Sequence, residues 1–433
     1  MEQNGTKKFD YMWVMVVLCF MIIAISLGFC SSGRNLYLTA ITDALDIPRG
    51  AFSINNTIRF ATSTIFSLYF GKLVMRFGTK KLICAGFLCL MAFSIINTYA
   101  SHLYLFYIGS IFLGIGISWT STTMISVVIN RWCKRNKGTI TGAVLAANGI
   151  GGAVAVQIIS PIIFEEGNPF GYRNSYHLVT SILIVMLVLI LIFFREKPKG
   201  DTGALVIEGK KRKSRGQGWS GIDYATAIKK PYFYIALFCM AGIGITLQGL
   251  GGIGTPHMYD IGFDKSYVAL LSSTANICLT FTKFLSGYMY DKFGMRKTMN
   301  ISLTCAFFSL IALITLTNTP SGRTIAFVRS IVGTIATPLE TVMLPLFAME
   351  FFGSKDFEKF VGVFVAASYT GFAIGSPLGN LCYDIFGDYI VSFYIFSVLL
   401  VIVTVALQYA LLASRRERKR IESAEKEMSE ASI

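Results

Sequence analysis

The chain has 433 residues, and 54% of them are hydrophobic while only 15% are charged. A soluble domain carries about 25% charged residues, so the composition argues against an ordinary soluble enzyme or binding module. The net charge of +15 is compatible with nucleic-acid binding. The basic residues fall in loops between long apolar stretches, however, and we expect no nucleic-acid partner.

Apolar stretches long enough to cross a hydrocarbon core of ~30 Å as helices recur along the whole chain. In lipid the backbone must satisfy its own hydrogen bonds, and the stretches lack the alternation of barrel strands, so helices are predicted. The predicted spans are 11–40, 51–75, 82–99, 103–130, 138–164, 175–194, 231–258, 266–290, 298–317, 321–350, 358–382 and 388–413. The expected fold class is an all-α membrane protein with twelve transmembrane helices in two six-helix bundles.

One long polar segment, 195–230, separates the first six predicted spans from the last six. It is basic and Gly-rich, which is typical of a flexible connector. We therefore expect an N-terminal bundle at 1–194, a linker at 195–230, a C-terminal bundle at 231–413 and a tail at 414–433.

The basic residues also predict an orientation. Most of the 39 Lys and Arg residues lie near the termini, in the linker and in alternate loops. By the positive-inside rule, both termini and the linker are expected in the cytoplasm of an integral protein of the cell's inner or plasma membrane. The apolar run from Tyr11 is longer than a signal-peptide core, so we expect it to be retained as the first helix.

No feature of the sequence indicates a cofactor. The nine cysteines form no CxxC pair and lie mostly in apolar runs, where they are expected to serve in packing. His102, His177 and His257 lie toward the outer ends of spans, where solvated histidines are expected. We find no phosphate-binding loop and no catalytic cluster, so we expect neither a metal nor a cofactor, and no enzyme activity.

The candidate site residues are ionisable or polar residues within spans, because a charge there costs several kcal/mol without a partner. Arg34 follows the apolar run of the first span. It is either a substrate-binding residue or an arginine at the membrane interface. Arg59 lies in the second span and shares a face with Asn55. It either attracts an anion or is a purely structural arginine.

The eighth span carries a polar stripe. Ser273, Asn276, Thr280, Lys283 and Gly287 step by three or four residues and share one face. Such a stripe on an apolar helix predicts a face toward an aqueous cavity, lined by Asn276 and Lys283. The alternative is that Lys283 snorkels to the interface about two turns away.

The tenth span carries Arg329 and Glu340, eleven residues and ~16 Å apart, which excludes a direct pair on a straight helix. Pro338 and Pro345 flank Glu340 and predict a kinked helix. Glu340 is the deepest acid of the chain and the candidate proton carrier. Its alternative role is a structural partner for an arginine of the first two spans.

Five further side chains could complete a pocket, although each alone is more often a packing residue. They are Trp119, Thr120 and Thr123 of the fourth span, Gln248 of the seventh and Tyr369 of the eleventh.

The two halves repeat a loop sequence. GKLVMRFGTKK at 71–81 and GYMYDKFGMRK at 287–297 both read G-x-x-x-x-[RK]-F-G-x-[RK]-K, with an offset of 216 residues. A duplicated six-helix unit indicates a secondary transporter with its substrate site near the midplane between the halves.

Both loops resemble the signature loop of the major facilitator superfamily, G-x-x-x-D-[RK]-x-G-x-[RK]-[RK]. The second copy keeps the aspartate as Asp291, whereas the first has Met75, which puts the usual ion pair of that loop in doubt. The resemblance implies the major facilitator fold and a conformational role for the loops. The residues implied are Gly71, Arg76, Gly78, Gly287, Asp291, Gly294 and Arg296.

Within that superfamily the chain resembles the monocarboxylate transporters and their oxalate–formate exchanger relatives. The resemblance rests on Asp10-Tyr11-Met12-Trp13 at the first helix and on Arg131-Trp132 followed by 137–142 at the fifth. It implies that Lys283 holds a substrate carboxylate. The acid that proton-linked relatives place one turn before this cation is replaced by Leu279.

The expected function is alternating-access transport of a small organic anion, a monocarboxylate, by a monomer, either with protons or by anion exchange. The four embedded cations Arg34, Arg59, Lys283 and Arg329 outnumber the one acid Glu340, which favours an anionic ligand. The relatives that carry dicarboxylates use a second cation in the eleventh helix, and 366–371 has none. The alternatives are an oxalate–formate type dicarboxylate exchanger, a transporter-like receptor and a membrane-bound enzyme.

Overall fold

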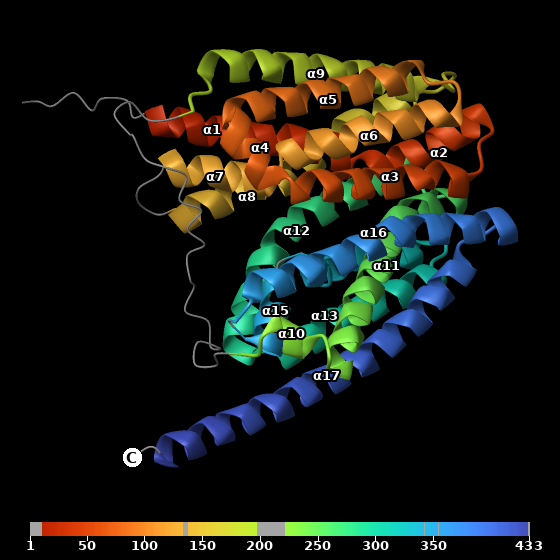
Figure 1. The fold of residues 1–433 in the computed structure, drawn as a ribbon. Helices are drawn as coiled ribbons and strands as arrows, with labels where there is room; N and C mark the ends of the chain where they lie inside the picture. Colours follow the sequence, from red (N-terminus) through yellow and green to blue (C-terminus); the bar gives the residue numbers. More distant parts are fainter. Residues whose placement is uncertain (1–10, 133–136, 197–220, 342, 354, 432–433) are drawn as a thin grey trace, which may run out of the picture.

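The computed structural model describes residues 11–132, 137–196, 221–341, 343–353 and 355–431. All regular elements in these ranges are helices, and they form two bundles (Figure 1). The predicted all-α fold class is confirmed. Position 10 and positions 133–136 of the family motifs, and most of the linker (197–220), lie outside the described residues.

The N-terminal bundle contains six spans, three of which are divided into shorter helices. Its elements are α1 (Tyr11–Ile23), the π-helix η1 (Ala24–Ser32), α2 (Arg34–Leu45), α3 (Arg49–Leu68), α4 (Phe70–Phe77), α5 (Thr79–Tyr99), α6 (Leu103–Trp119), α7 (Thr122–Trp132), α8 (Lys137–Ile163) and α9 (Gly171–Phe193).

The C-terminal bundle also contains six spans, preceded by a short helix from the end of the linker. Its elements are α10 (Tyr224–Ala227), α11 (Pro231–Asp260), α12 (Lys265–Phe293), α13 (Met295–Ile314), α14 (Pro320–Val332), the 3-10 helices η2 (Gly333–Ile335) and η3 (Thr337–Glu340), α15 (Leu344–Phe352), α16 (Phe357–Phe386) and α17 (Ile390–Ala431).

Two of the twelve spans differ in character from the rest. Ten helical segments of the described chain are long and apolar enough to cross a membrane by length and composition. The second span (α3–α4) is not among them because it carries Arg59 and a row of amides and hydroxyls. The tenth span is divided into α14, η2, η3 and α15, which extends the kink predicted from its prolines into a full break of the α-helix.

Each bundle has its own apolar core, and the bundles meet along two pairs of helices. One core is built almost entirely from the first six spans, with Ala269 of α12 added, and the other from α10 and the last six spans. Across the interface α3 packs against α16, and α8 packs against α12. In Figure 1 the bundles lie close together where α2 and α3 meet α11 and α16, and they diverge toward the end that carries the linker.

The repeated loops have the same backbone geometry, as the duplicated sequence predicts. Gly78 ends α4 with φ 80° and ψ 165°, and Gly294 ends α12 with φ 78° and ψ 169°. In both copies the next helix begins at the following residue. A residue with a Cβ is strained at such a positive φ, which explains glycine at both positions.

The ends of the linker and of the chain are more ordered than a flexible connector and a tail would be. The Ile222 amide donates to the carbonyl of Phe352 at 3.0 Å, and the Tyr224 amide donates to Oδ2 of Asp356 at 3.0 Å. The predicted tail instead continues the last span, because α17 runs to Ala431. These contacts fix residues 221–230 on the C-terminal bundle.

Candidate functional site

Arg59 lies near the middle of the second span. It is ten residues from the start of α3, which is ~15 Å along the axis and half of a ~30 Å hydrocarbon core. Its Nη1 donates to Oγ of Ser31 at 2.9 Å, and its guanidinium lies 4.1 Å from the ring centroid of Phe60. Its Nε is buried without a hydrogen-bond partner.

The π-helical stretch of the first span supplies the partner of Arg59. Ser31 belongs to η1, where the wider turn interrupts the α-helix. A Cβ at Gly28 would lie 2.5 Å from the backbone of Gly151, so η1 and α8 approach closely. Single π-turns within α-helices occur frequently at functional sites.

Arg34 lies beside Arg59 on the same side of the interface. Its Nη1 donates to Oδ1 of Asn56 at 2.6 Å, and Asn56 is three residues from Arg59 on α3. The two guanidinium charges lie close enough to repel each other. Among the described residues no carboxylate lies within 4.0 Å of either arginine.

A small polar cavity lies on the other side of Arg34, inside the N-terminal bundle. It has a volume of about 20 Å³, and its polar lining includes Arg34, Asn55, Asn97, Ser110 and Tyr176. Oδ1 of Asn97 is buried without a hydrogen-bond partner. The cavity has room for about one water, which could satisfy that oxygen and hold Arg34 in place.

Tyr369 connects the arginines to the C-terminal bundle. Its ring centroid lies 6.1 Å from that of Phe60 and 5.3 Å from that of Phe372. It interacts electrostatically with Arg59 on one side and with Glu340 on the other. The predicted site residue from the eleventh span therefore lies within electrostatic range of both halves of the site.

Glu340 and Lys283 form the C-terminal half of the site. Glu340 is 5% exposed at the end of η3, and its Oε1 accepts a hydrogen bond from Nε2 of Gln248 at 2.9 Å. Its Oε2 is buried without a partner. Lys283 is half-buried and close enough to interact with the Glu340 charge, although the two do not form an ion pair within 4.0 Å.

Two hydroxyl groups of the polar stripe of the eighth span pack against α8. Oγ of Ser273 donates to the carbonyl of Ala153 at 3.0 Å, and Oγ1 of Thr280 donates to that of Ala146 at 3.4 Å. Asn276 lies against the glycines of α8, near Ser32. In this structure the polar face therefore contacts the N-terminal bundle, with Ser273 buried and the rest of the stripe partly exposed.

Trp119 and Thr120 lie at the end of α6, and the structure does not bring Thr120 to the charged residues. Thr120 is fully buried and its hydroxyl donates to the carbonyl of Gly116 within its own helix. Trp119 packs edge-to-face on Phe66 with the ring centroids 5.6 Å apart, and its Nε1 is buried without a partner.

Arg329 lies apart from the central charges, inside the C-terminal bundle. Its Nε donates to Oγ of Ser309 at 3.2 Å, and its guanidinium packs against Gly254. His257 lies nearby, and one of its ring nitrogens is 3.1 Å from the carbonyl oxygen of Leu313.

The residues of the repeated loops lie at the linker end of the bundles. Gly71 lies in α4, and Gly287 and Asp291 lie in α12. Arg76 is exposed, whereas Nε of Arg296 donates to Oε1 of Gln408 at 2.8 Å.

A cluster that sequence reasoning missed joins the bundles at the end opposite the linker. Nη1 and Nη2 of Arg49 donate to the two carboxylate oxygens of Asp260 at 2.6 and 2.9 Å, and its guanidinium lies 4.2 Å from the ring centroid of Tyr383. Asp384 accepts from the backbone amides of Arg49 at 3.0 Å and Gly50 at 2.6 Å. We call Arg49, Asp260 and Asp384 the inter-bundle clamp.

The available sequence signal for the clamp was weak. Arg49 is a basic residue on the side of the membrane where few basic residues are predicted, and its partners are acids at the same ends of distant spans. Since these partners are 211 and 335 residues away in the chain, only the folded arrangement brings them together.

Comparison with known proteins identifies the class of this fold. The family model "Major Facilitator Superfamily" matches residues 16–255 and 236–432. Two six-helix bundles with charged residues between them define a secondary transporter of this kind and not an enzyme. The chain belongs to the major facilitator superfamily.

Particular relatives are distant in sequence. The chain is 22% identical over 306 residues to the uncharacterized transporter YcxA of Bacillus subtilis (strain 168), covering 70% of this chain and 71% of that protein. It is 21% identical over 364 residues to the sialic acid transporter NanX of Escherichia coli (strain K12), covering 82% of each.

Among solved structures, a mutant of the nucleoside transporter NupG superposes with a TM-score of 0.75 at 12% identity, covering 92% of this chain and 99% of that one. At this identity the likeness concerns the fold alone.

Proposed function

We propose that this protein transports a small organic anion with a single carboxylate by alternating access. The observation that carries the proposal is the pair Arg34 and Arg59, which lie side by side in the N-terminal bundle without a carboxylate partner among the described residues. Two like charges in a low-dielectric region repel each other and are costly unless an anion compensates them. A substrate carboxylate can accept two parallel hydrogen bonds from a guanidinium, which favours an anionic substrate over a neutral one.

The C-terminal half of the site offers a way to couple substrate to protons. Lys283 lies within electrostatic reach of Glu340, whose Oε2 has no hydrogen-bond partner. An ionised Glu340 competes with the substrate for Lys283, and a proton on Glu340 removes that competition. Proton binding then favours anion binding, which is the requirement for symport.

Tyr369 fits the same scheme because it interacts electrostatically with both halves of the site. It lies within electrostatic range of Arg59 and Glu340, and its hydroxyl could hydrogen-bond the part of the substrate that is not the carboxylate. We propose substrates of the size of lactate or pyruvate, as the monocarboxylate-transporter resemblance implies.

One relative favours a second candidate substrate class. NanX is named as a transporter of sialic acid, and the match covers 82% of both chains. Sialic acid is itself a monocarboxylate, but it is a larger acidic sugar. A transporter of acidic sugars would use the same arginine pair and need more hydrogen-bonding partners around it.

Uptake by proteoliposomes tests the proposal. The purified protein should exchange a labelled monocarboxylate against the unlabelled compound, and an inside-directed proton gradient should accelerate uptake. Binding without any uptake would favour a receptor. Strong competition by oxalate or succinate with none by monocarboxylates would favour a dicarboxylate exchanger.

A further inference from the structure

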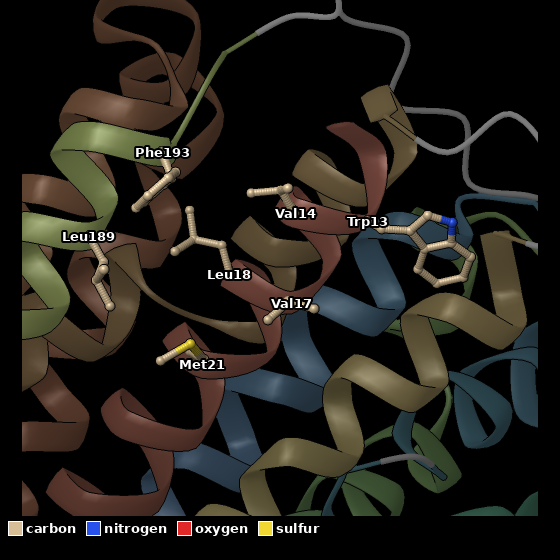
Figure 2. Close-up of a pocket in the computed structure, with 7 residues that line it drawn as sticks. All are labelled: Trp13, Val14, Val17, Leu18, Met21, Leu189 and Phe193. Atoms are coloured by element: carbon tan, nitrogen blue, oxygen red, sulfur yellow. The ribbon is translucent and has the colours of Figure 1, made fainter. Parts of the chain in front are cut away.

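An apolar groove runs along the outer surface of the N-terminal bundle between the first and sixth spans. It has a volume of about 340 Å³, and it is lined only by apolar side chains: Trp13, Val14, Val17, Leu18, Met21, Leu189 and Phe193. In Figure 2, Leu189 and Phe193 of α9 face Val14, Leu18 and Met21 of α1, while Trp13 lies farther from α9.

The length of the groove matches half of a bilayer. The nine residues from Trp13 to Met21 rise ~12 Å along α1. One leaflet of a ~30 Å hydrocarbon core is ~15 Å thick. A chain lying in the groove therefore begins near the membrane interface and ends before the midplane.

Aromatic and basic side chains mark the interfacial end of the groove. Tyr11 donates from its hydroxyl to the carbonyl of Phe193 at 2.5 Å, and its ring centroid lies 5.8 Å from that of Trp132. The guanidinium of Arg195 lies 4.1 Å from the Tyr11 ring centroid. Tyr and Trp are characteristic of the headgroup level.

Two cations at this end lack a carboxylate within ion-pair distance in the described part of the chain. Arg195 is exposed, and it follows the groove residue Phe193 by two positions. Nζ of Lys80 donates to the carbonyl of Leu191, four residues before Arg195. An anion at the end of the groove would lie near these two cations, which outnumber the neighbouring carboxylate of Glu196 beside Gly78.

We propose that this groove binds one anionic glycerophospholipid, with an acyl chain along α1 and α9 and the phosphate at Arg195 and Lys80. The basic residues and the interfacial aromatics place the headgroup in the leaflet on the linker side. Charge complementarity favours a lipid over a second copy of the chain, because a two-fold contact through this groove would bring like cations together. In the bilayer the selectivity comes from the headgroup, since acyl chains gain little by leaving other acyl chains.

Native mass spectrometry of the full-length protein tests this site with phosphatidylglycerol and phosphatidylcholine of identical chains. The protein should retain phosphatidylglycerol preferentially. Arg195→Gln should reduce its occupancy about fivefold, the size expected for one basic side chain near an anionic headgroup. Leu189→Trp should fill the groove and reduce the occupancy of both lipids.

Two matched controls lie outside the groove. Arg416→Gln removes an exposed cation at the start of the C-terminal extension, and Val185→Trp adds bulk to an exposed position of α9. Both should retain the lipid as the wild type does. Met21→Phe replaces Leu189→Trp as the filling variant if the latter does not fold.

Three results would overturn the proposal: equal retention of the two lipids by the wild type, unchanged phosphatidylglycerol occupancy in Arg195→Gln, or lipid-free dimers that Leu189→Trp dissociates. The last result would assign the groove to a second copy of the chain.

Discussion

The two halves of the central site handle charge in different ways. In the N-terminal half, Arg34 and Arg59 lie together, and their hydrogen-bond partners within the described ranges are the neutral side chains of Asn56 and Ser31. In the C-terminal half, Lys283 faces an acid, Glu340, that is buried with one free oxygen. We propose that the first half is a fixed positive side that holds an anion, and that the net charge of the second half changes with one proton.

This comparison predicts that the largest loss follows from the N-terminal half. Arg59→Gln leaves a substrate carboxylate without its charged partner, and we expect counterflow to fall at least ~100-fold. Counterflow in proteoliposomes measures it. Arg323→Gln, which breaks an exposed ion pair with Asp264, is the control and should transport normally. Normal counterflow by Arg59→Gln would move the anion site elsewhere.

In the C-terminal half, removing Lys283 and Glu340 together should impair anion exchange less than removing Lys283 alone. Lys283→Gln removes the cation and leaves Glu340 to repel the substrate, so we expect proton-driven uptake to be lost and exchange to fall more than ~10-fold. Lys283→Gln combined with Glu340→Gln should recover exchange. If the double variant is no better than Lys283→Gln, the two charges are not coupled.

Removing only the acid should separate coupling from transport. Glu340→Gln cannot carry a proton but leaves Lys283 free for the anion, so pH-driven uptake should disappear while anion exchange continues. The measurement is uptake with and without a proton gradient in the same vesicles. Unchanged stimulation by the gradient would eliminate Glu340 as the carrier and favour a structural role.

Loss of the inter-bundle clamp should have a smaller effect than loss of the central charges, and it should alter the equilibrium between conformations. Arg49→Gln removes a bidentate, partly buried ion pair with Asp260. The conformational equilibrium should therefore shift ~10-fold toward the state in which the two bundles are separated at that end. Spin-label distances between the loops after α2 and after α16 report it. Lys355→Gln, which breaks an exposed ion pair with Asp223 at the end of the linker, is the control. An unchanged distance distribution would show that other contacts hold this end.

The smallest effect is expected at the linker end. The Lys359 ammonium and the Tyr224 amide hold the pKa of the Asp356 carboxyl below its ordinary value of 3.8. A lowered folded-state pKa stabilises the contact above the unfolded value, and the stabilisation is lost as the pH falls through the folded value. Hydrogen exchange of residues 222–228, corrected for intrinsic rates, should therefore accelerate below about pH 4, and Asp356→Asn should abolish this dependence.

Much of this architecture is predictable from the sequence because its causes are local. The length of the apolar stretches predicts the spans, and the repeated loop sequence predicts the duplication. The glycine before each new helix predicts the matching turns at Gly78 and Gly294. The two prolines of the tenth span predict its irregular backbone near Glu340.

The rest depends on which faces meet, and periodicity alone does not contain that information. The stripe that includes Ser273 is polar because it crosses the interface to α8, and the same pattern would suit a cavity wall. Arg49 meets its acids only after both bundles have formed. The proximity of Arg34 to Arg59 likewise depends on the π-turn of the first span, which no local sequence rule predicted.

The most direct test of the account is ligand stabilisation of the purified protein by matched acids and amides. Lactate and lactamide, pyruvate and its amide, and sialic acid and its methyl ester differ mainly in the charge that the arginine pair is proposed to bind. At least one acid should raise the melting temperature, its neutral partner should not, and Arg59→Gln should abolish the difference. Stabilisation by neutral sugars or organic cations alone, or an equal response of Arg59→Gln to the acid, would contradict it.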